Sequence, residues 1–189
     1  VLYNYSVPLL NNKFLASGSD SEIVEFDCTT GEYQAFKTSC AIWCMTWWHD
    51  KLNNKLRLIE GEFEEPFNIR IREWQGNEKA NVVATLKYHK NSMRELIVID
   101  NPSCNSNQML LSASDDGYIT LWDLQTFTLV RKFNSAQGQV YGMCMLSNNN
   151  LFATAGNGMS IQCWDLNNED CIFIKENAHS AIIGTLLFS

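Results

Sequence analysis

Three residue types that form hydrolytic triads occur together in the sequence, as His89, Ser112 and Asp116. A serine nucleophile needs solvent exposure, a histidine oriented as a base, and donors that stabilise the oxyanion. The spacing of these three residues does not supply those conditions by itself. The elements that hold them must therefore be found before any chemistry is assigned.

Other chemical motifs in the chain are incomplete. Asp115-Asp116 and Glu64-Glu65 are paired carboxylates in predicted turns, but acid–base work needs environments that separate their pKa values. Residues 156–158 read Gly-Asn-Gly, yet a strand-like segment follows where dinucleotide binding requires a helix. The phosphate-binding pattern G-x-x-x-x-G-K is absent. We predict no catalytic residue and no bound cofactor.

The cysteines and histidines do not form a metal-binding pattern. No C-x-x-C occurs, and His49, His89 and His179 lie far from any cysteine pair in the sequence, so we expect no metal site. Cys144 and Cys163 lie within apolar runs and are expected to be small buried side chains. Free thiols in this number, seven in all, favour the reducing cytoplasm or nucleus.

Composition predicts a folded chain with an acidic surface. Hydrophobic residues make up 46% and charged residues 19%, which excludes a disordered chain. No apolar run approaches the ~18–20 residues of a membrane helix, so no membrane partner is expected. The net charge of −7 disfavours general nucleic-acid binding. Residues 51–94 are locally basic, and we interpret them as a solvated surface of alternating charges.

Three gapless windows share one pattern, and they cover residues 16–28 (ASGSDSEIVEFDC), 112–124 (SASDDGYITLWDL) and 154–166 (TAGNGMSIQCWDL). Each reads as a small-residue strand, a polar turn, and an alternating strand that ends in an aromatic residue and an acid. The Asp-Asp-Gly and Asn-Gly turns are expected to supply positive φ angles. A weaker copy at residues 64–76 ends in Trp74-Gln75.

The spacing of a second motif agrees with the first. Residues 136–147 align with residues 178–189 at an offset of 42, which is also the offset from Trp122 to Trp164. Residues 38–48 form a third copy of this element. Two motifs with one period, close to the ~40–45 residues of a four-stranded propeller blade, indicate a repeat architecture.

The repeat resembles the WD-repeat (WD40) β-propeller family, most clearly at Trp122-Asp123 and Trp164-Asp165 and least clearly over residues 49–88. The resemblance implies an all-β arc of about four four-stranded antiparallel blades. We place the blades at residues 1–37, 38–88, 89–136 and 137–178, with the first strand of a fifth blade at residues 179–189. Rings of this family usually have seven or eight blades, so we expect the remaining blades from the same chain or another.

The family pattern also implies roles for the residues first considered as catalytic. In the family, a histidine before strand a, a hydroxyl residue on strand b, an aspartate in the b–c turn and the tryptophan of strand c form a structural hydrogen-bonded chain. The resemblance assigns this network to His89, Ser112, Asp116, Trp122, Trp164, Asp20 and His179. Blade 4 departs from the pattern at Gln137 and Gly158, and blade 1 has Phe26, which has no donor.

The resemblance further implies that protein or peptide partners bind at a rim of the propeller. Trp47 and Trp48 are the most unusual rim residues, because exposed tryptophan is enriched at binding hot spots. The alternative is that both rings pack between blades. The candidate partner-binding residues are Trp47, Trp48, His49, Tyr88, Lys90, Asp115 and Asn157.

These observations favour a non-catalytic scaffold or adaptor that mediates protein–protein interactions within a multi-subunit complex. Two alternatives stay open. The chain is the propeller portion of a larger enzyme or regulatory chain, or it belongs to a nucleic-acid-associated complex and uses the basic segment 51–94. We do not expect direct nucleic-acid binding, and the sequence does not identify a partner.

Overall fold

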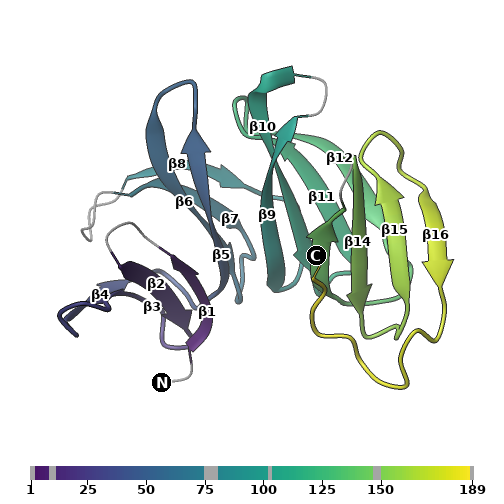
Figure 1. The fold of residues 1–189 in the computed structure, drawn as a ribbon, viewed down its shortest axis with the longest axis horizontal. Helices are drawn as coiled ribbons and strands as arrows, with labels where there is room; N and C mark the ends of the chain where they lie inside the picture. Colours follow the sequence, from purple (N-terminus) through teal and green to yellow (C-terminus); the bar gives the residue numbers. More distant parts are fainter. Residues whose placement is uncertain (1–2, 9–11, 75–80, 102–103, 147–149, 188–189) are drawn as a thin grey trace. The chain divides into compact units, whose positions relative to one another are not determined.

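The computed structural model describes residues 3–8, 12–74, 81–101, 104–146 and 150–187 (Figure 1). They form four antiparallel four-stranded sheets, which confirms the all-β, blade-type fold predicted from the repeat. The described residues contain no helix, and therefore none that is long and apolar enough to cross a membrane. The chain consists of two compact units, residues 1–93 and 94–189, and we describe each separately.

The first unit contains two sheets, which we call blades 1 and 2, and in both the strand order follows the sequence. Blade 1 consists of β1 (Tyr3–Pro8), β2 (Lys13–Gly18), β3 (Glu22–Asp27) and β4 (Tyr33–Lys37). Blade 2 consists of β5 (Ile42–Asp50), β6 (Lys55–Glu62), β7 (Ile69–Glu73) and β8 (Val82–Leu86). The blades share a core of Val7, Leu15, Ile23, Cys40, Ile42, Met45 and Leu58.

The second unit contains blades 3 and 4, built in the same strand order. Blade 3 consists of β9 (Met93–Asn101), β10 (Cys104–Ser114), β11 (Tyr118–Asp123) and β12 (Thr128–Asn134). Blade 4 consists of β13 (Val140–Met145), β14 (Leu151–Gly156), β15 (Ile161–Asp165) and β16 (Cys171–Lys175). Figure 1 shows β16 in yellow at the outer edge of blade 4.

The packing between blades 3 and 4 follows from the two-residue period of a strand. Alternate side chains point to opposite faces of a sheet, so each blade presents two different packing surfaces. Leu111, Leu121 and Phe133 of blade 3 share one core with Phe152 and Trp164 of blade 4. The Phe133 ring lies edge-on to both aromatic rings of blade 4, at centroid distances of 5.0 Å and 5.8 Å. This interdigitated aromatic core holds the second unit together.

In blades 1, 3 and 4, the turn between the second and third strands has one residue with a left-handed backbone at the same position. Ser21, Gly117 and Met159 have φ angles of 57°, 82° and 57°. They occupy equivalent positions in the three repeat windows. In blade 4 the positive φ angle is adopted by Met159, which follows the Asn-Gly dipeptide, and not by Gly158. Left-handed backbone costs a residue with a Cβ atom roughly 1–2 kcal/mol.

We expect Met159→Gly to raise the free energy of unfolding by up to about 1 kcal/mol, because glycine adopts left-handed backbone without steric cost. Urea denaturation followed by tryptophan fluorescence measures the change. Met159→Ala is the matched control, because it also shortens the side chain but retains a Cβ atom. An alanine variant that gains as much stability as the glycine variant would contradict the explanation.

Residues 179–187 do not form the predicted first strand of a fifth blade. They lie against blade 4 instead. The His179 N–H donates to the Met159 carbonyl at 3.3 Å, and the N–H of the buried Ile183 donates to the Gly156 carbonyl at 3.2 Å. A strand needs a continuous ladder to a neighbouring strand, and these isolated bonds do not form one.

Candidate protein-interaction surfaces

A chain of buried hydroxyl groups connects β10 and β11, the second and third strands of blade 3. The indole Nε1–H of Trp122 donates to Thr120 Oγ1 at 2.7 Å, and Thr120 Oγ1 lies 2.5 Å from Ser112 Oγ. Ser112 and Thr120 are fully buried and directly opposite each other. The Ser112 hydroxyl is thus an internal hydrogen-bond partner and lacks the exposure that a nucleophile needs.

Thr120 is the member of this chain that the sequence analysis missed. It precedes Trp122 by two residues on one strand, so both side chains lie on the same face. That alternation is the signal that identifies Thr120 from sequence.

We expect Thr120→Val to lower the free energy of unfolding by about 1–3 kcal/mol, because it leaves the Trp122 N–H and the Ser112 hydroxyl without Thr120 in a buried site. Valine replaces a hydroxyl by a methyl group, so little volume changes. Thr126→Val is the control, because Thr126 lies in the exposed β11–β12 turn. Equal stability of the two variants in chemical denaturation would refute the importance of the buried chain.

The other predicted members of the blade 3 network lie in turns and loops. Asp116 is in the β10–β11 turn, where its Oδ1 accepts the Tyr118 N–H at 2.9 Å and its own N–H donates to Ser114 Oγ at 3.1 Å. His89 belongs to the first unit, is buried, and contacts the Tyr88 ring edge-on at 5.7 Å. The structure therefore brings Ser112 and Trp122 together through Thr120, with Asp116 ordering the adjacent turn.

In blade 4, a different residue accepts the hydrogen bond of the tryptophan indole. The Trp164 Nε1–H donates directly to Thr154 Oγ1 at 2.9 Å, and Thr154 is the positional equivalent of Ser112. Gln162 replaces Thr120, and its Nε2 donates to the Ser135 carbonyl at 2.8 Å in a buried bond. The indole of blade 4 therefore has an acceptor although the histidine and aspartate of the pattern are missing.

Blade 1 has apolar side chains at the same positions. Ala16 lies opposite Val24, and Phe14 lies opposite Phe26, with the two rings 5.3 Å apart. No donor on these side chains needs a buried acceptor. Asp20, predicted as part of the network, is an exposed residue of the β2–β3 turn.

Blade 2 replaces the hydroxyl chain with buried ion pairs. Glu60 lies opposite Arg70, and Arg72 Nε donates to Glu60 Oε2 at 2.9 Å. Arg70 Nε lies 2.5 Å from Glu62 Oε1, and the side chains of both glutamates are almost fully buried. Burial raises the pKa of the Glu60 carboxyl although the Arg72 guanidinium opposes that change. Desolvation therefore outweighs the attraction of the partner.

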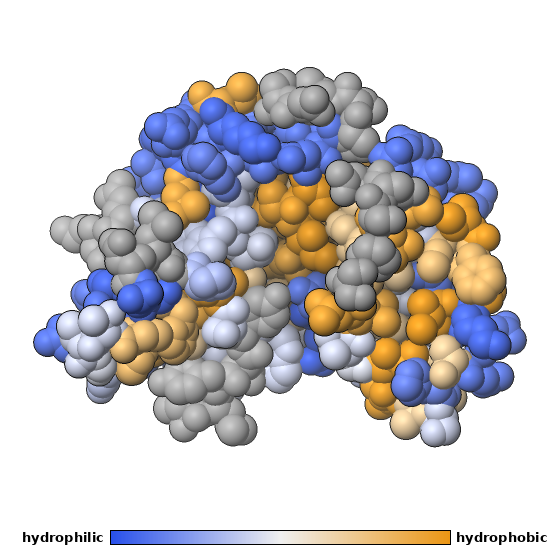
Figure 2. Space-filling model, in the orientation of Figure 1, coloured by the Kyte–Doolittle hydropathy of each residue, from blue (hydrophilic) through white to orange (hydrophobic). Residues whose placement is uncertain are grey.

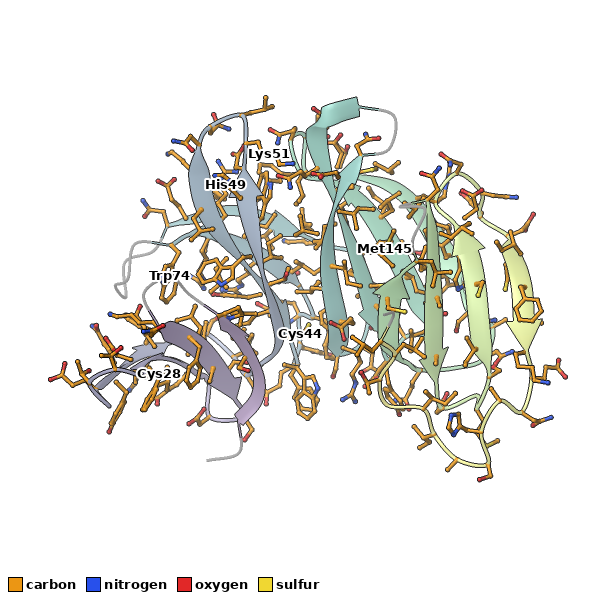
Figure 3. All side chains as sticks on the ribbon, viewed as in Figure 1. Cys28, Cys44, His49, Lys51, Trp74 and Met145 are labelled. Atoms are coloured by element: carbon orange, nitrogen blue, oxygen red, sulfur yellow. The ribbon has the colours of Figure 1, made fainter. Side chains whose placement is uncertain are left out.

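Trp74 is not the anchoring aromatic residue of blade 2, contrary to the alignment of the fourth window. Arg72 lies opposite Leu58, a residue in the core of the first unit. In blade 3, Trp122 lies opposite Leu110, so Arg72 occupies the position that corresponds to Trp122. The longer connection between β6 and β7 shifts the window by two residues. Figure 3 shows Trp74 beyond β7, where its ring contacts Phe36 at 5.2 Å.

The two consecutive tryptophans of β5 have different environments. Trp48 is fully buried, and the guanidinium carbon of Arg57 lies 4.6 Å from the centre of its ring. Trp47 is half-buried, lies edge-on to Trp74 at 6.1 Å, and donates its Nε1–H to the Pro8 carbonyl at 2.6 Å. Trp48 thus has a packing role, whereas Trp47 and Trp74 form a partly exposed aromatic pair.

The remaining rim candidates differ in how accessible they are. His49, which Figure 3 labels near the end of β5, Lys90 and Asn157 are exposed, and Tyr88 is half-buried. Asp115 does not fit its predicted role as an exposed partner-binding residue, because its side chain is only 5% exposed. Arg94 holds it with two parallel bonds, Nε to Oδ1 at 2.7 Å and Nη2 to Oδ2 at 2.5 Å. This fork geometry satisfies the carboxylate internally.

The basic segment 51–94 is largely neutralised by neighbouring acids. Five of its basic side chains form ion pairs, namely Lys55–Glu73, Arg57–Asp50, Arg70–Glu62, Arg72–Glu60 and Arg94–Asp115. Lys87 and Lys90 are exposed. The prediction of alternating charges describes this segment, but Arg70 and Arg72 pair inside the blade and not at a solvated surface.

The described residues contain no cluster of three or more histidine, cysteine or acidic side chains that could hold a metal ion. The described cysteines are free thiols, Cys28 on the surface and Cys40 and Cys44 in the interior. Burial raises the pKa of Cys40 to about 11, with a further contribution from the Glu62 carboxylate. Cys40 is therefore a protonated, unreactive packing residue at neutral pH.

The comparison with known proteins agrees with the repeat and the fold. The family model for the WD domain, G-beta repeat (WD40), matches residues 71–123 and 127–165. These two segments make up just under half of the chain, which therefore contains WD repeats. WD repeats are typical of scaffolds for protein–protein interaction, and proteins of this family are typically non-catalytic.

Curated relatives share this WD-repeat character. WD repeat-containing protein 55 homologs of Drosophila persimilis and Drosophila erecta are 28% identical over 102 residues and 26% identical over 101 residues. Each alignment covers 53% of this WD-repeat chain and 19% of the relative. The match therefore spans about a fifth of the length of these relatives.

The first and last blades of the WD-repeat chain each leave apolar side chains exposed. In blade 1, Tyr33 lies opposite Phe26 on the face that points away from blade 2, and it is 72% exposed. In blade 4, Phe173 lies opposite Cys163 and is 58% exposed. Figure 2 shows the hydrophobic surface over β16, where Ile172 and Ile174 are also exposed. Such patches on a folded chain mark interaction surfaces.

Proposed function

We propose that the chain is part of a non-catalytic WD-repeat scaffold that binds protein partners within a multi-subunit complex. The observation that supports this proposal is the contrast between its interior and its surface. Buried polar side chains such as Glu60 and Arg72 of blade 2, Ser112 and Thr120 of blade 3, and Thr154 and Trp164 of blade 4 pair with one another. Apolar side chains of blades 1 and 4 remain exposed. The exposed apolar side chains favour association with a partner over catalysis.

The open faces are proposed docking surfaces for the remaining blades. Phe14 and Phe26 form a cross-strand pair in blade 1. The equivalent pair in blade 4 is Phe152 and Trp164, and both of its rings are buried against blade 3. The last blade offers the complementary surface. Phe173 corresponds to Arg131, whose Nη1 donates to the Leu166 carbonyl of the next blade at 2.6 Å. Each open face therefore repeats a surface that packs against a neighbouring blade in the second unit.

Neither alternative function gains support from the structure. The hydroxyl of the one serine considered as a nucleophile is buried and hydrogen-bonded to Thr120. The hollow beside Arg131 and the one beside Tyr33 each have a volume of about 190 Å³, smaller than the roughly 300–1,000 Å³ of typical small-molecule sites. Five described basic side chains of segment 51–94 pair with acids, which weakens their attraction for a phosphate backbone.

The proposed compartment is the cytoplasm or nucleus. The described cysteines form no disulfide, and Cys40 and Cys44 are buried within the first unit. Free thiols of this kind persist where glutathione and thioredoxin keep the environment reducing. Fractionation of cells that express the tagged protein tests this location.

Affinity purification of the intact protein, followed by quantitative mass spectrometry, tests for a rim partner. One variant, Lys90→Glu with Asp20→Lys, reverses two exposed charges. Asp20 lies in the turn between the second and third strands of blade 1, and Lys90 lies in the connection between blades 2 and 3, loops that the family pattern places on one rim. The second variant, His49→Glu, alters the end of β5 beside the β5–β6 connection, which the family pattern places on the opposite rim. We expect one variant to lose a partner that the other retains, because charge complementarity sets specificity at such surfaces.

The two variants serve as controls for each other, because all three positions are exposed and their replacement should leave the blades folded. Unchanged tryptophan fluorescence confirms that the fold is retained. If native purification recovers no stoichiometric partner, the scaffold proposal is wrong. If partners are recovered equally by both variants, binding does not use these rim residues.

A further inference from the structure

Asn157 and Gly158 form the only Asn-Gly dipeptide of the sequence, and they lie in the turn between β14 and β15. The peptide nitrogen that follows an asparagine is a nucleophile toward the side-chain carboxamide carbon. Glycine at that position lets the nitrogen approach, because it carries no Cβ atom and turns freely about its backbone. The dipeptide is therefore the most reactive asparagine sequence in the chain.

The Asn157 side chain is accessible, and Gly158 is partly buried beside Gln137. The residue is exposed, and its Nδ2 makes only a long hydrogen bond of 3.3 Å to Gln139 Oε1. Among the described residues, no acceptor takes the Gly158 N–H. The attacking nitrogen does not have to break a hydrogen bond within the described protein before it reacts.

The bond that closes this turn is long and its backbone is strained, although neighbouring segments also donate to the Gly156 and Met159 carbonyls. Met159 closes it with a 3.4 Å bond from its N–H to the Gly156 carbonyl, and its φ of 57° is a left-handed conformation unfavourable for methionine. Blade 3 has Gly117 at the equivalent position, where this backbone conformation carries no such cost. Reorientation of the blade 4 turn would therefore relieve the strain at Met159.

We propose that Asn157 is a site of spontaneous deamidation. The Gly158 nitrogen forms a bond to Asn157 Cγ, the Cγ–Nδ2 bond breaks, and ammonia leaves with the proton lost by the Gly158 nitrogen. Water then opens the resulting succinimide at either carbonyl. The product is aspartate or isoaspartate, and both carry a new carboxylate at neutral pH.

The new carboxylate changes the hydrogen bonds of this rim. Gln139 Oε1 accepts the Tyr141 hydroxyl at 2.5 Å and Asn157 Nδ2, so deamidation replaces a donor to that oxygen by a repelling acceptor. Isoaspartate also lengthens the backbone, which displaces the Asn157 N–H from the Gln139 carbonyl, now 3.2 Å away. At the equivalent position of blade 3, Arg94 neutralises Asp115, whereas Tyr141 and Gln139 provide no cation here.

Peptide mapping of the intact protein after incubation at neutral pH tests the proposal. Tandem mass spectrometry gives the converted fraction at each asparagine, and isoaspartyl methyltransferase labels the rearranged product. We expect conversion at Asn157 to proceed within about tenfold of its rate in the urea-unfolded chain, because Asn157 is exposed and no described acceptor holds the Gly158 N–H. The rate should also rise with pH, since the deprotonated amide is the nucleophile.

Asn167 is the internal reference, because it is also exposed but precedes Asn168. Faster conversion at Asn157 than at Asn167 supports the proposal, and equal or slower conversion overturns it. Asn157→Ser should abolish the more acidic form on anion exchange while tryptophan fluorescence stays native. If that acidic form persists in a folded Asn157→Ser variant, another residue is its source and the assignment to Asn157 is wrong.

Discussion

Replacing Trp164 by alanine is expected to lower the free energy of unfolding by about 3–5 kcal/mol, among the largest effects of any single change in the chain. Trp164 is 1% exposed and lies in the core shared by blades 3 and 4. Alanine removes the ring that stacks on Phe152 at 6.2 Å and faces Phe133 edge-on. Urea denaturation measures the loss.

Trp164→Phe separates the ring's packing from its hydrogen bond. Phenylalanine retains an aromatic ring in this core but removes the donor to Thr154. We expect this variant to recover most of the stability lost by alanine, with a residual cost of about 1 kcal/mol for the missing bond and the smaller ring. Equal destabilisation by both variants would show that the hydrogen bond, rather than the aromatic core, holds these blades together.

Arg72→Met should destabilise the first unit by about 3–5 kcal/mol, because it leaves Glu60 as a buried charge that has lost its guanidinium partner. The Glu60 side chain is 1% exposed, and burial already raises the pKa of its carboxyl with Arg72 present. Once the cation is lost, Glu60 must take up a proton or draw water into the core. Chemical denaturation at neutral pH checks the effect.

The double variant Glu60→Leu with Arg72→Met distinguishes a stabilising ion pair from a tolerated one. Two apolar side chains of similar volume remove both desolvation costs, so stability should return to near or above that of the original protein. Lys55→Ala is the surface control, because the Lys55–Glu73 pair is partly exposed and should contribute about 0–1 kcal/mol. A double variant as unstable as Arg72→Met alone would contradict this account.

The repeat predicted the sheets well because each strand carries its own local signal. Alternating residues such as those of 119–124, bounded by polar turns, predict strand pairs without knowledge of distant contacts. The spacing between aromatic residues then predicts that the pairs recur as blades. This explains why four four-stranded sheets could be expected before the structure was known.

The details that sequence analysis missed depend on register and on contacts between distant residues. The longer β6–β7 connection places Arg72 where the repeat pattern suggested Trp74, and no composition signal marks that shift. Arg94 neutralises Asp115 across 21 positions of the chain. Likewise, Met159 adopts the left-handed angle because the position in the turn, and not the residue type, determines the backbone there.

The central claim is that the open faces of blades 1 and 4 are packing surfaces for further blades. Phe173 is 58% exposed in the 189-residue chain. Hydroxyl-radical footprinting of the intact protein at this residue therefore tests the claim most directly. The buried Phe152 is the protected reference, and the urea-unfolded protein defines full reactivity. The account predicts that Phe173 is oxidised as slowly as Phe152 in the intact protein. Oxidation of Phe173 at the rate of the unfolded protein would contradict it.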